Sequence, residues 1–319
     1  MERDSTSGRR GMVLRLLVLL LLAAPALANY PLFDVATRMR VLLVPRDAAV
    51  GAVIYRLRAT DSDFDYPLHF DVGGDGAGAQ VAVVRLDNLP CTRNMSYCQA
   101  NVVLARKLDA GRVYDVRLRV RDSRGDATSI DAIVQLSNNS TPVDATFPRR
   151  PTLVMVPEDT KPGTELDYVI VRKNPRNSRH AIVELWGSPL FTLAQRLSSR
   201  TDTNASIILA GPLDYETQAM YTLDLYALDP FVEPGQDTRN IAGFQVAVVV
   251  VDVQDTPPEF IEAPPVTQLS PTLQVGDEVV RVRAEDGDKG KPRQIRYGLV
   301  SEGSPFTTFF TVDERTGGY

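Results

Sequence analysis

The sequence predicts an all-β protein made of tandem Greek-key β-sandwich repeats. Short segments in which apolar and polar residues alternate with period two recur along the chain, and turns rich in Pro and Gly separate them. No capped segment with the 3.6-residue period of an amphipathic helix follows the first 28 residues. Many short strands in units of about 110 residues are typical of tandem sandwiches.

The first 28 residues have the composition of a secretory signal peptide. Arg3, Arg9 and Arg10 form a basic start, the apolar run LLVLLLLAA follows, and ALA at residues 26–28 offers small residues for cleavage. The alternative is an N-terminal membrane anchor, but the apolar run is short for a membrane span. Export predicts an oxidising environment in which disulfides form.

An internal repeat runs through the chain. Its copies share a glycine followed by alternating apolar residues, at Gly51, Gly163 and Gly276, which lie 112 and then 113 residues apart. Later strands align as well, since residues 114–122 correspond to residues 221–229 and both segments end in an acid. A repeat of this length indicates one sandwich per copy.

The repeat divides the chain into four parts. We expect a signal peptide at residues 1–28, a degenerate first repeat at 29–146, a second repeat at 147–257 and a partial third repeat at 258–319. The third copy stops partway through a sandwich and lacks the strands that would complete its core. We therefore interpret the sequence as an N-terminal fragment of a longer protein.

Composition excludes several classes of function. The formal net charge of −5 at pH 7 argues against nucleic acid as a partner and leaves calcium open. The two histidines, His69 and His180, have no neighbours at metal-ligand spacing, so a zinc site is not expected. The chain has no nucleophile elbow and no HExxH motif, so it is not expected to be an enzyme.

The two cysteines, Cys91 and Cys98, are expected to pair and to close a short loop. Acceptors for N-linked glycosylation occur at Asn94, Asn138, Asn139 and Asn204. The acceptors at Asn138 and Asn139 overlap, so only one of them is expected to carry a glycan. Asn94 lies inside the loop between the cysteines, which we expect to be an exposed hairpin end.

Carboxylates gather where the second repeat meets the third. Residues just past the last strand of one repeat are expected to lie beside the start of the next, and their repulsion would be costly without a counter-charge. Oxygen ligands in this number suit Ca²⁺, whereas Mg²⁺ needs tighter octahedral geometry and Zn²⁺ favours His or Cys. The seven acids are Glu158, Asp214, Glu216, Asp252, Asp255, Asp286 and Asp288.

The motifs that carry these acids resemble those of the cadherin superfamily. The sequence contains PE at residues 157–158, LDYE at 213–216, DVQDTPPEF at 252–260 and AEDGD at 284–288. The stretch DGDKGKPRQIRY resembles early repeats of the long, tip-link type of cadherin. The resemblance implies immunoglobulin-like sandwiches of cadherin type, with the seven carboxylates and the main-chain carbonyl of Gln254 as calcium ligands. Gln254 stands where the family has Asn.

The first repeat departs from the family pattern. Arg46 stands at the position of the glutamate in PE, and Leu136 and Asn139 occupy linker positions where the family has acids. The second repeat has Lys173 and Pro175 in place of the next pair of acids. We therefore hypothesise that the joint between the first and second repeats binds little or no calcium.

Asp61, Asp63 and Asp65 lie in the first repeat, which has no preceding repeat to share an ion. They form either a solvated acidic loop or a calcium-stabilised tip that shapes a partner-binding surface. The expected mature N-terminus, NYPLFDVATRM, has no Trp, so the resemblance implies a protocadherin-like type without strand swapping. The sole tryptophan, Trp186, is expected to pack in the core of the second repeat.

These observations predict a calcium-dependent cell adhesion ectodomain in which Ca²⁺ stiffens the joint between the second and third repeats. The expected partners are other cadherin ectodomains, bound homophilically or heterophilically. The expected location is the extracellular side of the plasma membrane, in a membrane-anchored parent glycoprotein, or outside the cell in secreted form if the chain is complete. The alternative is a soluble or receptor-like extracellular binding module whose partner is not a cadherin.

Overall fold

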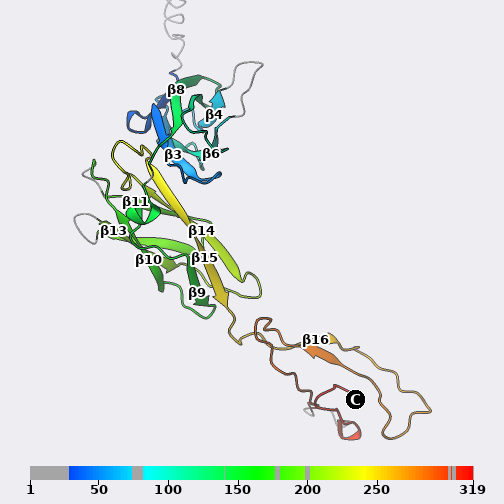
Figure 1. Cartoon of the computed structure of the whole chain (residues 1–319). Helices are drawn as coiled ribbons and strands as arrows, with labels where there is room; N and C mark the ends of the chain where they lie inside the picture. Colours follow the sequence, from blue (N-terminus) through cyan, green and yellow to red (C-terminus); the bar gives the residue numbers. More distant parts are fainter. Residues whose placement is uncertain are drawn as a thin grey trace, which may run out of the picture. The chain divides into compact units, whose positions relative to one another are not determined.

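The computed structural model is almost entirely β-structure, which confirms the predicted fold class (Figure 1). The helices among the described residues are α2 (Val143–Thr146) and two 3-10 helices, η1 (Val35–Thr37) and η2 (Thr307–Phe309). None of the helices in this part of the chain is long and apolar enough to cross a membrane. The predicted signal peptide lies outside the described residues. The structure describes residues 29–73, 82–139, 141–176, 180–197, 202–300, 303 and 307–318.

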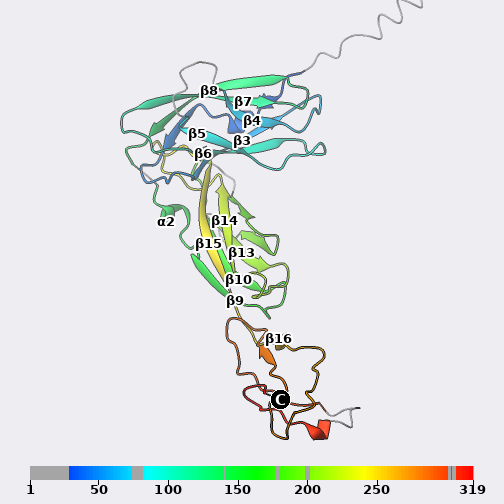
Figure 2. The same ribbon diagram turned by 90° about the vertical axis from the view of Figure 1, so that its right-hand side faces the viewer.

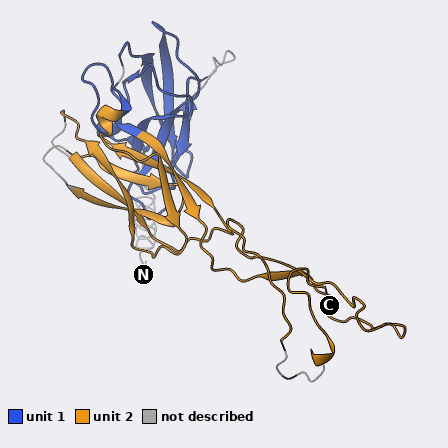
Figure 3. Ribbon diagram, turned by 60° about the horizontal axis from the view of Figure 1, so that its bottom comes forward, with its two compact units in different colours: residues 1–143, 230–242 blue, residues 144–229, 243–319 orange. Residues whose placement is uncertain are grey.

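The chain divides into two compact units (Figure 3). Unit 1 holds the residues up to 143 together with 230–242, and unit 2 holds 144–229 together with 243–319. The predicted boundary between the second and third repeats, at residue 257, falls inside unit 2. The segment 230–242, which the sequence repeat assigns to the second repeat, clusters with unit 1 instead.

Unit 1 is a sandwich of two four-stranded sheets, which lie one above the other in Figure 2. Its strands are β1 (Leu32–Phe33), β2 (Val41–Val44), β3 (Val53–Thr60), β4 (His69–Gly73), β5 (Val84–Asn88), β6 (Cys98–Leu104), β7 (Val113–Arg121) and β8 (Ala127–Leu136). The strand orders are β1-β3-β6-β5 and β2-β8-β7-β4. Apolar side chains from both sheets form one core, in which Leu57 and Leu118 are fully buried.

Unit 2 contains a second sandwich and a separate two-stranded sheet. Its strands are β9 (Leu153–Pro157), β10 (Glu165–Arg172), β11 (Ile182–Trp186), β12 (Phe191–Leu197), β13 (Asp202–Leu209), β14 (Met220–Leu228), β15 (Ile241–Val251), β16 (Glu259–Glu262) and β17 (Arg283–Glu285). The sandwich sheets have the orders β10-β13-β12 and β11-β14-β15-β9, and β16 pairs with β17.

The two sandwiches share one topology. β2 pairs with β8 in parallel, and β9 pairs with β15 in parallel at the same place in its sheet. The repeat glycines Gly51 and Gly163 have φ values of 90° and 92° and donate N–H bonds to Leu104 and Leu209 at 2.8 and 2.7 Å. Glycine adopts positive φ without the strain that a Cβ atom adds. The internal repeat of the sequence is therefore also a repeat of hydrogen bonding.

Side chains of β14 alternate between the core and the surface, as the period-two pattern predicts. Leu223 and Leu225 are fully buried, whereas Met220 is 59% exposed. The strand thus contributes one apolar face to the core of the second sandwich.

Trp186 lies at the end of β11 and is 37% exposed, so the prediction that it packs in the core is wrong. Residues two apart in a strand share a face, and Trp186 shares the outward face with Glu184. The indole N–H donates to Glu184 Oε2 at 3.2 Å. This bond gives the polar end of the ring a partner outside the core.

Residues 258–300 carry β16 and β17, and several of their apolar side chains are exposed. Phe260 and Val266 are 65% and 78% exposed. The described residues of this part supply no second sheet to pack on β16 and β17, which explains the exposure.

The structure joins Cys91 to Cys98, with Cα atoms 5.5 Å apart, and confirms the predicted disulfide. It closes the loop that leads into β6, and Asn94 in this loop is exposed. Asn138 and Asn139 are also exposed, whereas Asn204 is half-buried in β13, between β10 and β12. Glycosylation stays a prediction at all four positions, and Asn204 is the least accessible of them.

Replacing Leu223 with Ala is expected to lower the free energy of unfolding of unit 2 by about 2–5 kcal/mol, because a buried leucine loses its contacts and leaves a cavity. Denaturant unfolding followed by the fluorescence of Trp186, in the strand next to β14, measures this loss. Met220→Ala is the matched control, since Met220 lies in the same strand with its side chain exposed. Equal losses in the two variants would contradict the burial pattern of β14.

Candidate metal centre

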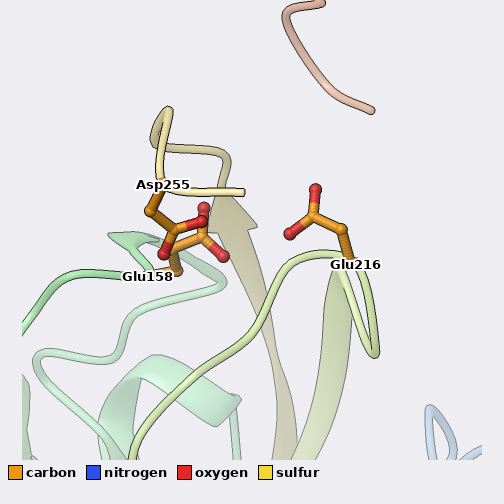
Figure 4. Close-up of side chains that lie close together, drawn as sticks. All are labelled: Glu158, Glu216 and Asp255. Carbon is orange, nitrogen blue, oxygen red and sulfur yellow. The ribbon is translucent and has the colours of Figure 1, made fainter. Parts of the chain in front are cut away.

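Carboxylates from four segments of unit 2 converge at the end of β15. One oxygen each from Glu158, Glu216 and Asp255 lies within 4.8 Å of the others, and these side chains face one another in Figure 4. Oxygens of Glu216, Asp252 and Asp288 form a second group of the same size. Glu216 belongs to both groups, so the structure brings five of the seven predicted acids together.

Strand ends bring these side chains to one edge of the sandwich. Glu158 follows β9 and Asp252 follows β15, and because these strands are parallel neighbours their carboxyl ends lie together. Glu216 lies in the loop before β14, whose start reaches the same edge because Val250 N–H donates to the carbonyl of Ala219 at 2.9 Å. The order of the strands in this sheet therefore places Glu158, Glu216 and Asp252 at one edge of the sandwich.

Glu158 is held by two main-chain donors. It is only 6% exposed, and its two oxygens accept N–H bonds from Tyr215 at 2.7 Å and Val253 at 2.6 Å. A buried carboxylate is costly unless hydrogen bonds or a cation compensate the lost water. The two bonds also tie the loop before β14 to the linker after β15.

Asp288, in the turn after β17, is held by the same linker. It is 3% exposed, and its Oδ1 accepts N–H bonds from Asp255 at 3.0 Å and Thr256 at 2.9 Å. Its Oδ2 accepts a bond of 2.8 Å from the side-chain amide of Gln254. The amide oxygen of Gln254 is buried without a hydrogen-bond partner among the described residues.

Asp252 completes the buried part of the centre. It is 8% exposed, and its Oδ2 accepts the N–H of Lys291 at 2.6 Å, while its Oδ1 is buried with no hydrogen-bond donor among the described residues. A Cβ atom at Gly290 would lie 2.4 Å from Asp252 Oδ2, so this close approach requires glycine. The N–H of Lys289 donates to Glu216 at 3.2 Å. Sequence reasoning missed Gly290, because only the spatial contact reveals its role.

Asp214 and Asp286 do not join the two carboxylate groups. Asp214 accepts bonds from the hydroxyl and the N–H of Thr217, at 2.7 and 2.9 Å, and these bonds hold its pKa below the ordinary value. The N–H of Arg293 donates to Asp286 and lowers the pKa of that carboxyl in the same way. Both acids are thus engaged in local turns, and the carbonyl of Gln254 as a ligand stays a prediction.

The arrangement fits a hard cation. Two unit charges 4.8 Å apart repel each other by about 3 kcal/mol at an effective dielectric constant of about 20. Asp252 and Asp288 are buried, so water screens the repulsion between their charges less than it would at the surface. One oxygen of Asp252 also has no hydrogen-bond donor among the described residues. An all-oxygen donor set without His or Cys suits Ca²⁺ better than Zn²⁺.

A second set of acids lies in unit 1. Asp61 is only 4% exposed, and burial raises its pKa, as do the charges of Asp122, Asp63 and Asp65, against the lowering effect of the N–H that Asp63 donates. Asp65 pairs with Arg124 at 3.0 Å. Asp61 is therefore not part of a simple solvated loop. Among the described residues these acids do not bring three ligand atoms together, so a tip calcium stays a prediction.

Two β-sandwiches of one topology, with a carboxylate centre at the strand ends of the second, define the class of protein: tandem β-sandwich repeats with a candidate metal site. The chain is 53% identical over 287 residues to Cadherin-86C of Drosophila melanogaster, a match that covers 90% of this chain and 15% of that protein. The chain belongs to the cadherin superfamily, which confirms the resemblance seen in its motifs. This superfamily comprises adhesion proteins rather than enzymes.

A second curated relative gives the same family. Human Cadherin-23 is 30% identical over 283 residues, which cover 86% of this chain and 8% of that protein. The solved structure of mouse Cadherin-23 EC22-24 aligns with 91% of this chain and 87% of its own, at 21% identity and a TM-score of 0.40. No protein-family model matches the chain. The chain spans only a small part of the curated relatives that it matches.

Gly290→Ala is expected to weaken calcium binding roughly tenfold, because the added methyl group displaces the turn that holds Asp252. Isothermal titration of the full chain with calcium measures the effect. Gly298→Ala is the matched control, since a Cβ atom there meets nothing within 4 Å. Native affinity in the Gly290 variant would show that the contact with Asp252 does not shape the site.

Proposed function

We propose that this chain is part of a calcium-dependent cell adhesion ectodomain in which Ca²⁺ stiffens the joint between residues 147–257 and 258–319. Membership of the cadherin superfamily supports an adhesive role. The observation that carries the proposal is the convergence of five carboxylates from four segments at the end of β15.

Two cation positions fit the geometry, because the two groups of three carboxylates share Glu216 as a bridging ligand. The resemblance to the family adds Asp214, Asp286 and the main-chain carbonyl of Gln254, which would bring the coordination closer to the 6–8 oxygens that Ca²⁺ takes. Asp214 and Asp286 would exchange their local hydrogen bonds for the ion.

The stiffening follows from where the ligands lie in the chain. Without the ion, hydrogen bonds to Glu158 and Asp288 hold the linker after β15 while the clustered carboxylates repel one another. A bound cation attracts all of these carboxylates at once, so it restrains the linker, the loop before β14 and the turn after β17 together. Extracellular calcium modules typically bind with roughly 10⁻⁴–10⁻³ M affinity, which matches the calcium outside cells.

We also propose other cadherin ectodomains as partners, bound homophilically or heterophilically, and a parent protein anchored in the plasma membrane with these repeats outside. The curated relatives that match the chain are themselves cadherins. Calcium is the second partner, through the carboxylate centre.

Glu158→Gln is expected to weaken calcium binding roughly tenfold, which corresponds to about 1.4 kcal/mol. The variant loses a charged ligand, and its amide group cannot accept both the Tyr215 and the Val253 N–H bonds. Titration calorimetry measures the affinity, with Asp159→Asn as a control for the same change of charge at the exposed neighbouring residue. Spin labels at the exposed positions Met220 and Val266 report the stiffening as a narrower distance distribution with calcium. An equally broad distribution with and without bound calcium would refute the stiffening.

Beads coated with the full chain are expected to aggregate in millimolar calcium and to disperse on chelation. Beads coated with the Glu158→Gln variant should need more calcium, whereas the Asp159→Asn variant should behave like the native chain. No aggregation of native beads, either alone or mixed with beads that carry other cadherin ectodomains, would contradict the adhesive role. Capture of a non-cadherin ligand under those conditions would establish the receptor-like alternative.

A further inference from the structure

The segment 230–242 contributes to unit 1 although it follows β14 in the sequence and includes the first two residues of β15, both strands of the second sandwich (Figure 3). We call this segment the edge clasp. It contains buried residues of its own, since Val232 is 4% exposed and Asp237 is fully buried. It is thus a folded part of unit 1 rather than a loop that lies in solvent.

The edge clasp occupies the open side of β2. This strand stands at the end of its sheet, with β8 on one side and no other strand of the described chain on the other. The hydroxyl of Thr238 donates to the carbonyl of Val41 at 3.0 Å and accepts the N–H of Leu43 at 2.9 Å. One hydroxyl therefore makes both bonds that a neighbouring strand would make at this point.

The edge clasp also occupies the open side of β3, in the other sheet. Among the described residues β1 pairs with β3 at Ala59 and Thr60, so the side chain of Asn240, rather than a strand, bonds the main chain of Arg56 on that side. The carboxamide of Asn240 accepts the N–H of Arg56 at 2.7 Å and donates to its carbonyl at 2.9 Å. This pair of bonds to one residue copies the hydrogen-bonded pair of an antiparallel ladder.

Internal contacts preorganise the edge clasp for these bonds. Asp237 accepts bonds from the guanidinium of Arg239, the shortest being 2.7 Å, and both charges are shielded from water. The N–H of Glu233 donates to the hydroxyl of Thr141, a buried residue, at 2.6 Å. The segment is therefore anchored at Glu233 as well as at Thr238 and Asn240.

The hydrogen bonds between the edge clasp and the strands of unit 1 involve no metal ligand. A cavity that the edge clasp helps to form is lined by Arg46, Asn138, Asn139, Glu233, Pro234 and Gln236, and Glu233 is the one carboxylate of this lining. Among the described residues, the groups of three acids that could hold a metal lie in unit 2 alone. The bonds of Thr238 and Asn240 are bonds between neutral groups, so they do not depend on calcium.

We propose that the edge of unit 1 formed by β2 and β3 is a docking surface whose occupant is the edge clasp, held by Thr238 and Asn240 independently of calcium. The clasp supplies side-chain hydrogen bonds to both sheets of the sandwich at positions where no strand of the described chain pairs with them. Residues 29–143 alone therefore do not complete unit 1.

Amide hydrogen exchange of the full chain, resolved by residue, tests this proposal. The N–H groups of Leu43 and Arg56 are expected to exchange slowly in calcium and equally slowly after chelation. Thr238→Val should speed exchange at Leu43 roughly tenfold, and Asn240→Ala should do the same at Arg56, because each amide loses its acceptor. Thr238→Ser, which keeps the hydroxyl group, should leave exchange at Leu43 slow.

The control is Glu233→Gln, in the same segment, which changes an exposed side chain and keeps the main-chain bond to Thr141. Slow exchange of core amides in β7 verifies that each variant is folded. Unchanged exchange at Leu43 in Thr238→Val and at Arg56 in Asn240→Ala would overturn the proposal. Faster exchange of these two amides in the native chain after chelation would overturn it as well. Exchange at Asp255 and Thr256 reports the calcium centre separately, so failure of one proposal is distinguishable from failure of the other.

Discussion

The carboxylate of Asp288 accepts the N–H groups of Asp255 and Thr256, and the organisation of unit 2 beyond β15 depends on this contact. It places the turn DGDKGK directly against the linker. A Cβ atom at Gly287 would meet the side chain of Thr256 at 2.3 Å, and one at Gly290 would meet Asp252 at 2.4 Å. The glycines of the turn are thus required by the same close approach that brings the acids together. The carboxylate centre is a consequence of how closely two stretches of backbone lie.

The carboxylate centre of unit 2 and the edge clasp of unit 1 rely on two different kinds of interaction. The carboxylate centre concentrates like charges, and the repulsion between them varies with ionic strength and with protonation. The edge clasp uses a hydroxyl and a carboxamide, which carry no charge at any physiological pH. The carboxylate centre is therefore sensitive to the ionic conditions of the solution, whereas the bonds of Thr238 and Asn240 do not involve charged groups.

Local regularity made much of this structure predictable from the sequence. The alternation in β14, the glycines that need positive φ and the acids after β9 and β15 each follow from short-range rules. The local hydrogen bonds of Asp214 and Asp286 were not predictable, because a motif gives the position of a carboxylate and not the direction in which its turn points it. Trp186 was misplaced for a similar reason, since the side of the strand on which it lies depends on the register of β11 with β14.

The edge clasp left no signal in the sequence. Thr238 and Asn240 are common loop residues, and their bonds join positions 195 and 184 residues apart. Such bonds depend on which strand edges stay open, and that is known only once both sheets have formed.

The open edges of β2 and β3 also bear on how pieces of this chain can be handled. Unpaired strand edges recruit strands from other molecules, and proteins avoid this by covering them. A fragment that ends before residue 230 would expose both edges and invite association between copies, even though it contains every strand of unit 1. Self-association of such a fragment in solution would then reflect the missing cover rather than an adhesive surface. The smallest piece that preserves unit 1 is discontinuous in sequence, so its boundaries cannot be chosen from the repeat pattern.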